Sequence, residues 1–433
     1  MSAIVIWLSP CRNSYTKLKS QCDGGGTKTT TSYFYNMEAK KNEDSRPLHV
    51  GRKFDGTLID LSKIDEITKP MRKEFLINFS FLQSLESCLK RKVDLSILYV
   101  FLSITCTVVP LSLALMTLEY TSGLSYWYLH ALGLVRLLFG VLQTEGFVLG
   151  LHYSSHRPIF KPDWEWVDYW VNIVISPLIG FPSNTYMAHH VTMHHKEDNA
   201  INYDASSTMP FQRDSWFHLL LYILRYLFFI QIELPLSLLL RGRYKETVTM
   251  LVGYFGYMTC VYYCYQVLPI ATLWVNILPF IILSVAAMRG NNIQHVFVSP
   301  EEPEDDFKLC YDLVNDPTNC GKFNDSFHVE HHLSPITHWA ELPTKFLEFL
   351  PRHKKQDSFI FTGLTPDDVH GYVMSGRLDI LADSYVHIGQ KSGKDKETLV
   401  KEMKHRLEPI RKFTKGKTSG GRRTATPASK KKE

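Results

Sequence analysis

The sequence predicts an all-α integral membrane protein with four transmembrane helices, further helices at the membrane interface and a cytosolic cap that carries clustered histidines. Two observations point to this class. The middle of the 433-residue chain contains long uncharged apolar stretches, although polar ends lower the mean hydropathy to -0.11. In addition, ten of the 18 histidines fall in four tight groups between positions 152 and 332, each near the end of an apolar stretch.

Four segments are long and apolar enough to cross a membrane. The first runs from about Leu95 to Met116 without a charged residue. About 22 helical residues, at 1.5 Å each, span a hydrocarbon core of roughly 30 Å. The other three expected spans cover about 126–151, 248–266 and 270–288.

Residues 166–186 and 216–240 are also apolar, but charged residues and prolines interrupt them. We expect both segments to lie in the membrane interface, anchored at headgroup level by tryptophans. If both crossed the membrane instead, the chain would have six spans. The interrupting residues are Asp168, Pro177, Pro182, Arg225, Glu233 and Pro235, and the tryptophans are Trp164, Trp166, Trp170 and Trp216.

The charge pattern orients the chain. The short segments 117–125 and 267–269, which join expected spans, contain no Lys or Arg, whereas basic residues collect at the opposite ends of the spans. The positive-inside rule then places both termini and all four histidine groups in the cytosol. The basic residues are Lys90, Arg91, Lys92, Arg157, Lys161, Arg241, Arg243, Lys245 and Arg289.

We divide the chain into a cytosolic, partly disordered N-terminal arm (1–90), a membrane domain with the histidine groups (91–350) and a cytosolic C-terminal region with a disordered basic tail (351–433). Residues 1–36 are rich in Ser and Thr and poor in acids, so they form either a targeting segment or an unstructured arm. The net charge is +5, but no alternation of basic and aromatic residues favours nucleic acid as a partner. The eight scattered cysteines are typical of reduced thiols.

Helix geometry places most clustered histidines on common faces. Residues four apart differ by about 40° around an α-helix, so His152 and His156 point the same way. By the same arithmetic His328, His331 and His332 share an arc of about 100°. The metal ligands expected from this reasoning are His152, His156, His190, His194, His195, His295, His328, His331 and His332.

Three other residues need separate interpretations. Asn291 precedes His295 by four residues, so its amide oxygen is an expected tenth ligand, directly or through water. His189 points away from the rest of its group, and we leave it outside the ligand set. Glu145 lies at membrane depth on the face of His152, roughly 10 Å along the helix. One interpretation is that it is a catalytic or hydrogen-bonding group near the substrate. The other is that it pairs with a neighbouring helix or with the membrane interface.

The number and type of ligands indicate two metal ions. Imidazole suits iron, zinc and copper, and a zinc site normally closes with four ligands, so nine histidines favour a dinuclear iron centre. Such a centre supplies an oxidant strong enough for an unactivated C–H bond, while the protein positions the substrate and excludes water. Glu197, Asp198 and Glu330 lie beside the histidines, and we expect them to support the ligands.

The histidine motifs resemble those of the membrane fatty acid desaturase superfamily, which includes hydroxylases and related oxidases. The likeness covers about 95–350 and implies four transmembrane helices with a cytosolic cap that binds two irons. The second motif departs from the usual HxxHH because it reads HxxxHH, a spacing similar to that of the alkane hydroxylase branch, and the third begins with His rather than Gln. The motifs are HYSSH from His152, HHVTMHH from His189, Asn291 to His295, and SFHVEHHLSP from Ser326.

The resemblance implies an acyl-lipid desaturase that uses O₂ and two Fe ions. Neither tail contains the HPGG motif of a fused haem domain, so we expect electrons from a separate carrier, cytochrome b5 or ferredoxin. A di-iron hydroxylase or ketolase is the nearest rival, because the same site can return oxygen to the substrate. Two more distant hypotheses are a zinc-dependent membrane hydrolase, which would need fewer ligands, and a non-catalytic membrane scaffold.

The last four residues, Lys430 to Glu433, resemble a dilysine retrieval signal. We therefore expect the endoplasmic reticulum membrane, with a plastid membrane as the alternative. The sequence determines neither the regioselectivity nor the headgroup of the lipid, because both depend on how side chains pack around the substrate.

Overall fold

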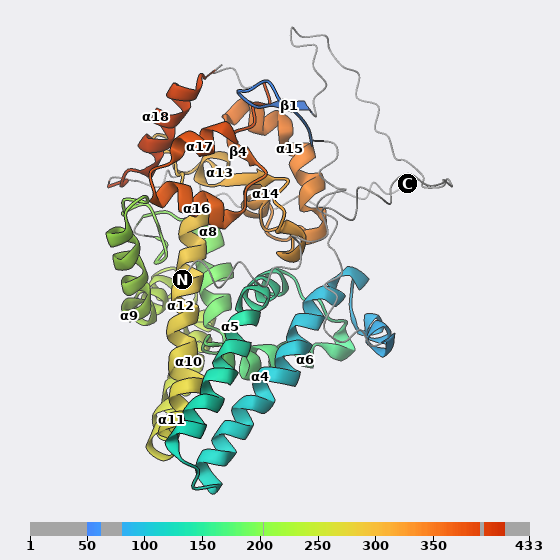
Figure 1. The fold of residues 1–433 in the computed structure, drawn as a ribbon, viewed down its shortest axis with the longest axis vertical. Helices are drawn as coiled ribbons and strands as arrows, with labels where there is room; N and C mark the ends of the chain where they lie inside the picture. The colour runs from blue at the N-terminus through green and yellow to red at the C-terminus, as the bar shows by residue number, and fades with distance from the viewer. Residues whose placement is uncertain (1–49, 62–79, 202, 390–393, 412–433) are drawn as a thin grey trace.

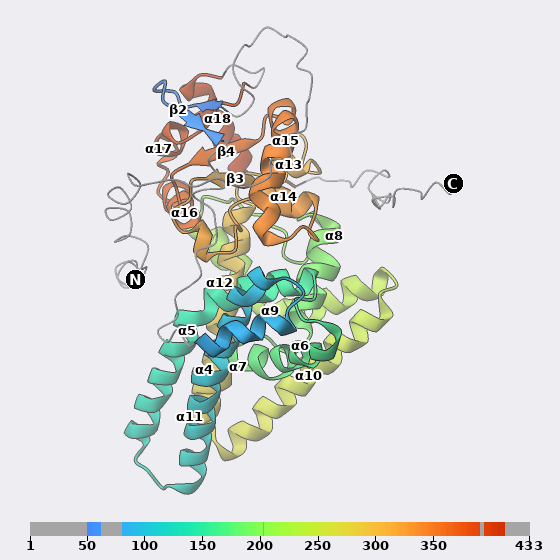
Figure 2. The same cartoon turned by 90° about the vertical axis from the view of Figure 1, so that its right-hand side faces the viewer.

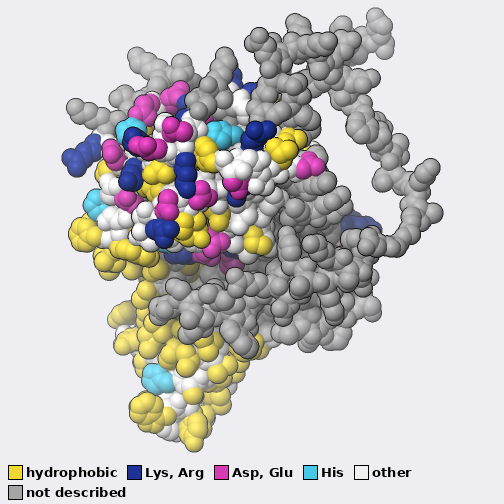
Figure 3. Space-filling model, turned by 45° about the horizontal axis from the view of Figure 1, so that its top comes forward, with side chains coloured by type: hydrophobic (Ala, Val, Ile, Leu, Met, Phe, Trp, Pro, Cys, Tyr) yellow, Lys and Arg dark blue, Asp and Glu magenta, His cyan; other side chains and the backbone are white. Residues whose placement is uncertain are grey.

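Long helices form a stalk, and shorter helices and strands, most of them from the C-terminal half, form a cap above it (Figure 1). The computed structural model describes residues 50–61, 80–201, 203–389 and 394–411. Hydrophobic side chains cover the visible lower end of the stalk, whereas charged side chains gather on the cap (Figure 3). The predicted fold class is confirmed: the chain is mostly helical, with two small two-stranded sheets among the described residues.

The stalk and the layer below the cap contain the following elements: η4 (Ser80–Cys88), η5 (Lys92–Asp94), α4 (Leu95–Thr121), α5 (Tyr126–His156), η6 (Pro162–Trp164), α6 (Trp166–Trp170), η7 (Val171–Ile175), α7 (Ser176–Ile179), η8 (Met187–His194), α8 (His195–Glu197), α9 (Trp216–Leu240), α10 (Tyr244–Val267), α11 (Pro269–Thr272), η9 (Leu273–Ile277) and α12 (Leu278–Gln294).

The cap contains β1 (Val50–Arg52), β2 (Leu58–Asp60), α13 (Asp306–Leu309), β3 (Tyr311–Val314), η10 (Asn319–Gly321), α14 (His328–Leu333), η11 (Trp339–Glu341), α15 (Leu342–Gln356), β4 (Phe359–Thr362), α16 (Pro366–Met374), α17 (Leu378–Asp383) and α18 (Lys396–Leu407).

Four helical segments in the described residues have the length and composition of membrane spans, which confirms the predicted number. They are Lys92–Thr121, Tyr126–His156, Trp216–Leu240 and Pro269–Gln294. One of them differs from our assignment, because we expected 216–240 at the interface and 248–266 as the third span. The six tyrosines of α10 lower its hydropathy, so composition selects α9 in its place.

The two helices also differ in direction. In two views at right angles, α9 lies across the long axis of the molecule beneath the cap (Figures 1 and 2). Helix α10 instead runs obliquely to the far end of the stalk, where it meets α11 (Figure 2). Of this pair, α9 therefore has the composition of a span, whereas α10 extends along the stalk, and our assignment of 248–266 as a span stays a prediction.

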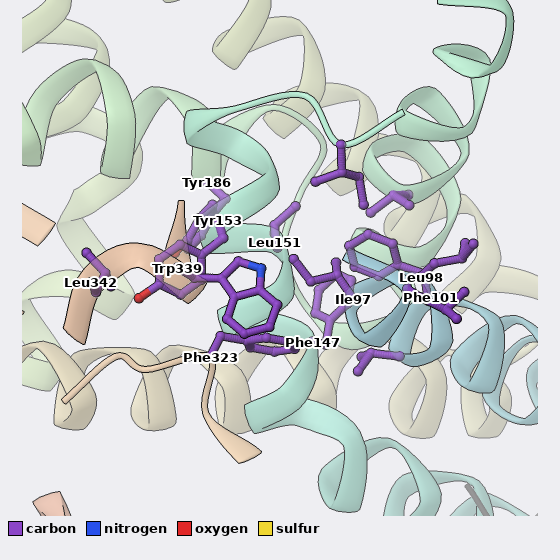
Figure 4. Packing of buried hydrophobic residues seen from close by; sticks show 14 of the residues in the cluster. Ile97, Leu98, Phe101, Phe147, Leu151, Tyr153, Tyr186, Phe323, Trp339 and Leu342 are labelled. Carbon is purple, nitrogen blue, oxygen red and sulfur yellow. The ribbon is translucent and has the colours of Figure 1, made fainter. Parts of the chain in front are cut away.

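A continuous hydrophobic core joins the stalk to the cap. Phe101 of α4 meets Phe147 of α5 edge to face, with ring centroids 6.1 Å apart. In the same cluster, Phe323 packs against Trp339, whose ring centroid lies 5.4 Å away (Figure 4). Since these last two residues flank α14, the core holds that helix above the end of α5.

The cap is built around a parallel strand pair. Strand β3 pairs with β4, with Tyr311 opposite Phe359, and helices α16 to α18 cover them. Strands β1 and β2 pair antiparallel at its edge, where Arg52 bridges to His387. The boundary that we drew at residue 350 stays a prediction, although strands from both sides of it share one hydrophobic core.

Candidate metal centre

The four histidine groups meet where the stalk joins the cap. His152 and His156 lie at the end of α5, and His295 directly follows α12. The second group lies on η8 and α8, and the third on α14. These elements therefore meet at the junction of stalk and cap, which brings together histidines that are far apart in the sequence.

Five histidines form the first of two groups. Their ligand atoms all lie within 4.8 Å of one another. The Nε2 atom of His331 lies 2.6 Å from that of His152 and 2.9 Å from that of His195, which in turn lies 3.0 Å from Nε2 of His190. The members of this first group are His152, His156, His190, His195 and His331.

The second group contains His194, His295 and His332, whose ligand atoms also lie within 4.8 Å of one another. His328 lies at its edge, since its Nε2 atom is 3.4 Å from Nε2 of His295. The ring centroids of His195 and His332 are only 4.6 Å apart, so the two groups are adjacent. The structure thus brings together all nine histidines that the sequence predicted as ligands.

The second motif forms a π-helix rather than the α-helix that we assumed. α-Helical geometry put His190 and His194 on one face, but η8 brings His190 to His195, five residues later, with ring centroids 4.5 Å apart. A π-turn accommodates one more residue than an α-turn. The additional residue in HxxxHH is absorbed in this way, and His194 turns to the second group.

Two residues stand outside these groups. His189 is buried against Tyr226, at a ring distance of 5.3 Å, and its omission from the ligand set stays a prediction. The amide nitrogen of Asn291 donates to Oη of Tyr222 (2.7 Å) and to the Ser206 carbonyl (3.1 Å). These bonds use both amide hydrogens, so the amide oxygen faces elsewhere, and Asn291 stays a predicted ligand.

An aspartate that sequence reasoning missed orients His194. Asp204 is buried and its Oδ2 lies 2.6 Å from Nδ1 of His194, which leaves Nε2 for a metal. Burial raises the pKa of Asp204, but the combined effect of His194, His189 and Ser206 outweighs it and holds the pKa below the ordinary value. The left-handed residues Asp198 and Asn199 turn the chain back to this position, and such an Asp-Asn pair is the signal that could have indicated the turn.

The acids that we did expect to support the ligands have different partners. Oδ1 of Asp198 lies 3.9 Å from Nδ1 of His332. Glu197 instead pairs with Arg241 at 2.7 Å. Glu330 faces away from the ligands, and its Oε1 lies 2.7 Å from Nε2 of His353.

Glu145 lies in an ion pair at the boundary between stalk and cap. Its carboxylate is 2.8 Å from Nζ of Lys322, in the loop before α14, and its side chain is 64% exposed. This contact matches the second of our two interpretations, a partner in the neighbouring structure. Glu145 as a catalytic residue stays a prediction.

Burial holds the histidines that lie outside the spans in the neutral form, which is the form that binds metals. It lowers the pKa of His190, His195 and His331 well below the ordinary value, and neighbouring imidazoles lower it further. The same causes lower the pKa of three more histidines, so a lone pair is free on each ring at neutral pH. These three are His295, His328 and His332.

Unpaired ring nitrogens test whether metals fit this site. Within the described residues, Nε2 of His156 and both ring nitrogens of His332 are buried without a hydrogen-bond partner. Buried polar atoms are normally paired, so these nitrogens need another partner. A metal ion bound by each group of neutral imidazoles would meet that need, because imidazole is a good ligand for iron, zinc and copper.

The comparisons with known proteins agree with this geometry. No curated protein and no solved structure matches the chain significantly. The sequence matches the model of a family described as "Fatty acid desaturase" over residues 125–361, which is more than half of the chain. The match includes all four histidine groups, and we conclude that the chain belongs to the fatty acid desaturase family.

Proposed function

We propose that this protein is an oxygen-dependent, di-iron desaturase that introduces a carbon–carbon double bond into the acyl chain of a lipid. The observation that carries the proposal is the convergence of nine histidines into two adjacent groups at the end of apolar helices. Iron bound there would supply the oxidising power needed to break an unactivated C–H bond.

The protein's own residues have three tasks in this reaction. The two histidine groups would hold one iron each, and Asp204 fixes the ring of His194. The hydrophobic core around Phe323 and Trp339 would exclude water on its side of the site. The apolar stalk helices accept the acyl chain from the membrane, so that one carbon pair lies beside the histidines.

The reaction requires an external electron donor. Removing two hydrogens from adjacent methylenes supplies two electrons, whereas reduction of O₂ to two waters needs four electrons and four protons. Two electrons must come from a separate carrier, for which we propose cytochrome b5 or ferredoxin, and two protons from the solvent.

We further propose the endoplasmic reticulum membrane with both termini in the cytosol, and a plastid membrane as the alternative. The predicted retrieval signal and the candidate targeting segment at residues 1–36 lie outside the described residues. The support for the orientation is therefore the distribution of basic residues along the spans.

Product analysis tests the proposal. The full chain is expressed in a host that lacks the activity, and its lipids are compared by gas chromatography of methyl esters with those of a His331→Ala variant. We expect a new double bond, without a retained oxygen atom, that the variant does not make. An oxygenated product would favour the hydroxylase or ketolase, and activity with zinc and without O₂ would favour the hydrolase. An unchanged product in the variant would remove the metal centre from the reaction.

A further inference from the structure

A buried polar cluster lies behind the third histidine motif. Asp312 of β3, Glu330 of α14 and His353 of α15 are completely buried. Nε2 of His353 lies 2.7 Å from Oε1 of Glu330 and 3.7 Å from Oδ2 of Asp312. Its Nδ1 atom lies 2.6 Å from Oγ of Ser358, so both ring nitrogens of His353 are engaged.

This cluster fixes α14 at two points. Oδ1 of Asp312 accepts a hydrogen bond from the backbone N–H of Val329 at 3.0 Å, near the start of the helix, where N–H groups lack partners within the helix. One residue later, the side chain of Glu330 is held by His353. The rings of Phe307 and Phe346 pack against His353, with centroids 4.8 and 5.1 Å away, so its position is itself fixed.

Helix α14 needs such support because it has only six residues. A helix of this length is not stable by itself. On an α-helix, Glu330 points about 160° away from both His328 and His332. The cluster therefore holds the side of the helix that is opposite to those ligands.

The same short helix supplies ligands to both groups. His331 belongs to the first group and His332 to the second, with His328 at its edge. A rotation of α14 would consequently displace ligands of both metals at once. Asp204 provides a contrast, because it contacts a histidine of the second group alone.

We propose that Glu330, Asp312 and His353 are positioning residues that hold α14 so that both iron ions bind together. This inference rests on the proposed di-iron function. The direct hydrogen bond between Glu330 and His353, together with the bond from Val329 to Asp312, favours this role over a third metal site in the cluster.

Metal content tests the inference without a measurement of activity. Full-length wild type and variants are purified in detergent after growth with iron, and each metal is counted per chain during titration with a chelator. We expect two irons in wild type and a loss of both in Glu330→Leu, with at least tenfold weaker binding. Glu330→Gln keeps a hydrogen bond to His353 and should retain both irons. Asp204→Ala should lose one.

Asp94→Asn is the matched control for a general loss of stability. Asp94 is a buried carboxylate that contacts His338 (3.0 Å) and Trp339 (2.9 Å) at the junction of stalk and cap. We expect this variant to unfold at a lower temperature and to keep both irons. If Glu330→Leu does not fold, Ser358→Ala, which removes only the hydroxyl beside His353, should still weaken iron binding at least twofold.

Each contrary result has a separate meaning. Two tightly bound irons in Glu330→Leu, or no change in Ser358→Ala, would overturn the positioning role alone. Three ions in wild type and two in Glu330→Leu would identify the cluster as a cation site and also overturn it. Fewer than two ions in wild type would overturn the proposed function and this inference with it.

Discussion

At the scale of single residues, the neighbours of a side chain decide what it does. Glu145 is an acid at the depth of the membrane by sequence, yet its contact is Lys322 of the cap loop, 2.8 Å away. Burial lowers the pKa of Lys322, but Glu145 and nearby acids raise it above the ordinary value, so the lysine is charged at neutral pH. The pair therefore links a stalk helix to the loop that precedes α14.

We expect Glu145→Gln to retain more than half of the activity and to lower stability by at most about 1 kcal/mol, because the glutamate is largely exposed. The exchange of charges in Glu145→Lys with Lys322→Glu should recover part of the stability lost in each single variant. Thermal unfolding and turnover check this. A hundredfold fall in kcat with unchanged stability would instead identify Glu145 as catalytic.

His370 on α16 predicts a pH dependence of stability. Burial lowers its pKa to about 4, and the positive charge of Arg289 contributes. The unfolded chain, with a histidine pKa of about 6.5, binds the proton first as the pH falls. The stability from neutral His370 is thus complete above about pH 6.5 and is lost between about pH 6.5 and 4.

Replacement of His370 by Phe removes this titration. We expect wild type to lose about 1–2 kcal/mol more stability than His370→Phe between pH 7 and pH 5, since one pKa unit corresponds to about 1.4 kcal/mol. Unfolding in detergent at both pH values measures it. Equal losses in the two proteins would show that the pKa of His370 is the same in the folded and the unfolded chain.

At the scale of secondary structure, irregular helices position the site. Three π-helices lie in the described residues, η7, η8 and η9, and such turns are frequent at functional sites. Arg136, fully buried in α5, donates to Oγ of Ser112, to the Leu178 carbonyl at the end of α7 and to the Trp274 carbonyl in η9. One side chain thereby joins α4, α5, α7 and η9.

The π-helix η8 predicts that the second motif tolerates the loss of one residue better than a gain. Deletion of half-buried Val191 leaves His190 and His195 four residues apart, and an α-helix then places them on one face. We expect this variant to keep iron within about tenfold of the wild-type affinity. Insertion of an alanine after Val191 should abolish binding, and if the deletion is as damaging as the insertion, the π-helix is not interchangeable with an α-helix.

At the scale of the whole molecule, the cap and the stalk share one junction, and the orientation of the stalk decides which compartment contains the histidines. The segment between α4 and α5 lies at the end of the stalk opposite the cap (Figure 2). The absence of Lys and Arg from this segment predicts a lumenal location.

An extended loop with an Asn-Gly-Thr glycosylation acceptor, inserted at Gly123, tests this orientation. Gly123 adopts φ +58° in the turn between the two helices, and a Cβ atom there would contact nothing within 4 Å, so an insertion is compatible with the fold. We expect a glycosylated, glycosidase-sensitive product. The same acceptor added at the C-terminus should stay unmodified, and the reverse pattern would invert the topology.

Much of this arrangement could be predicted because it depends on local sequence. The uncharged stretch at α4 and the spacing of His152 and His156 each reflect the period of a helix, and the structure agrees with both. The exchange of α9 and α10 shows the limit of composition, since tyrosines lower the hydropathy of a helix that reaches the end of the stalk.

The sequence by itself determined the membrane class, the number of spans and the family, and it predicted which histidines would lie together. These properties follow from apolar length, helical period and motif spacing, which neighbouring residues encode. Only the tertiary structure decided how the histidines divide between two groups, why His190 meets His195, and that Asp204 and His353 stand behind them. Those contacts join residues from separate helices, strands and loops, and the packing of the cap on the stalk brings them together.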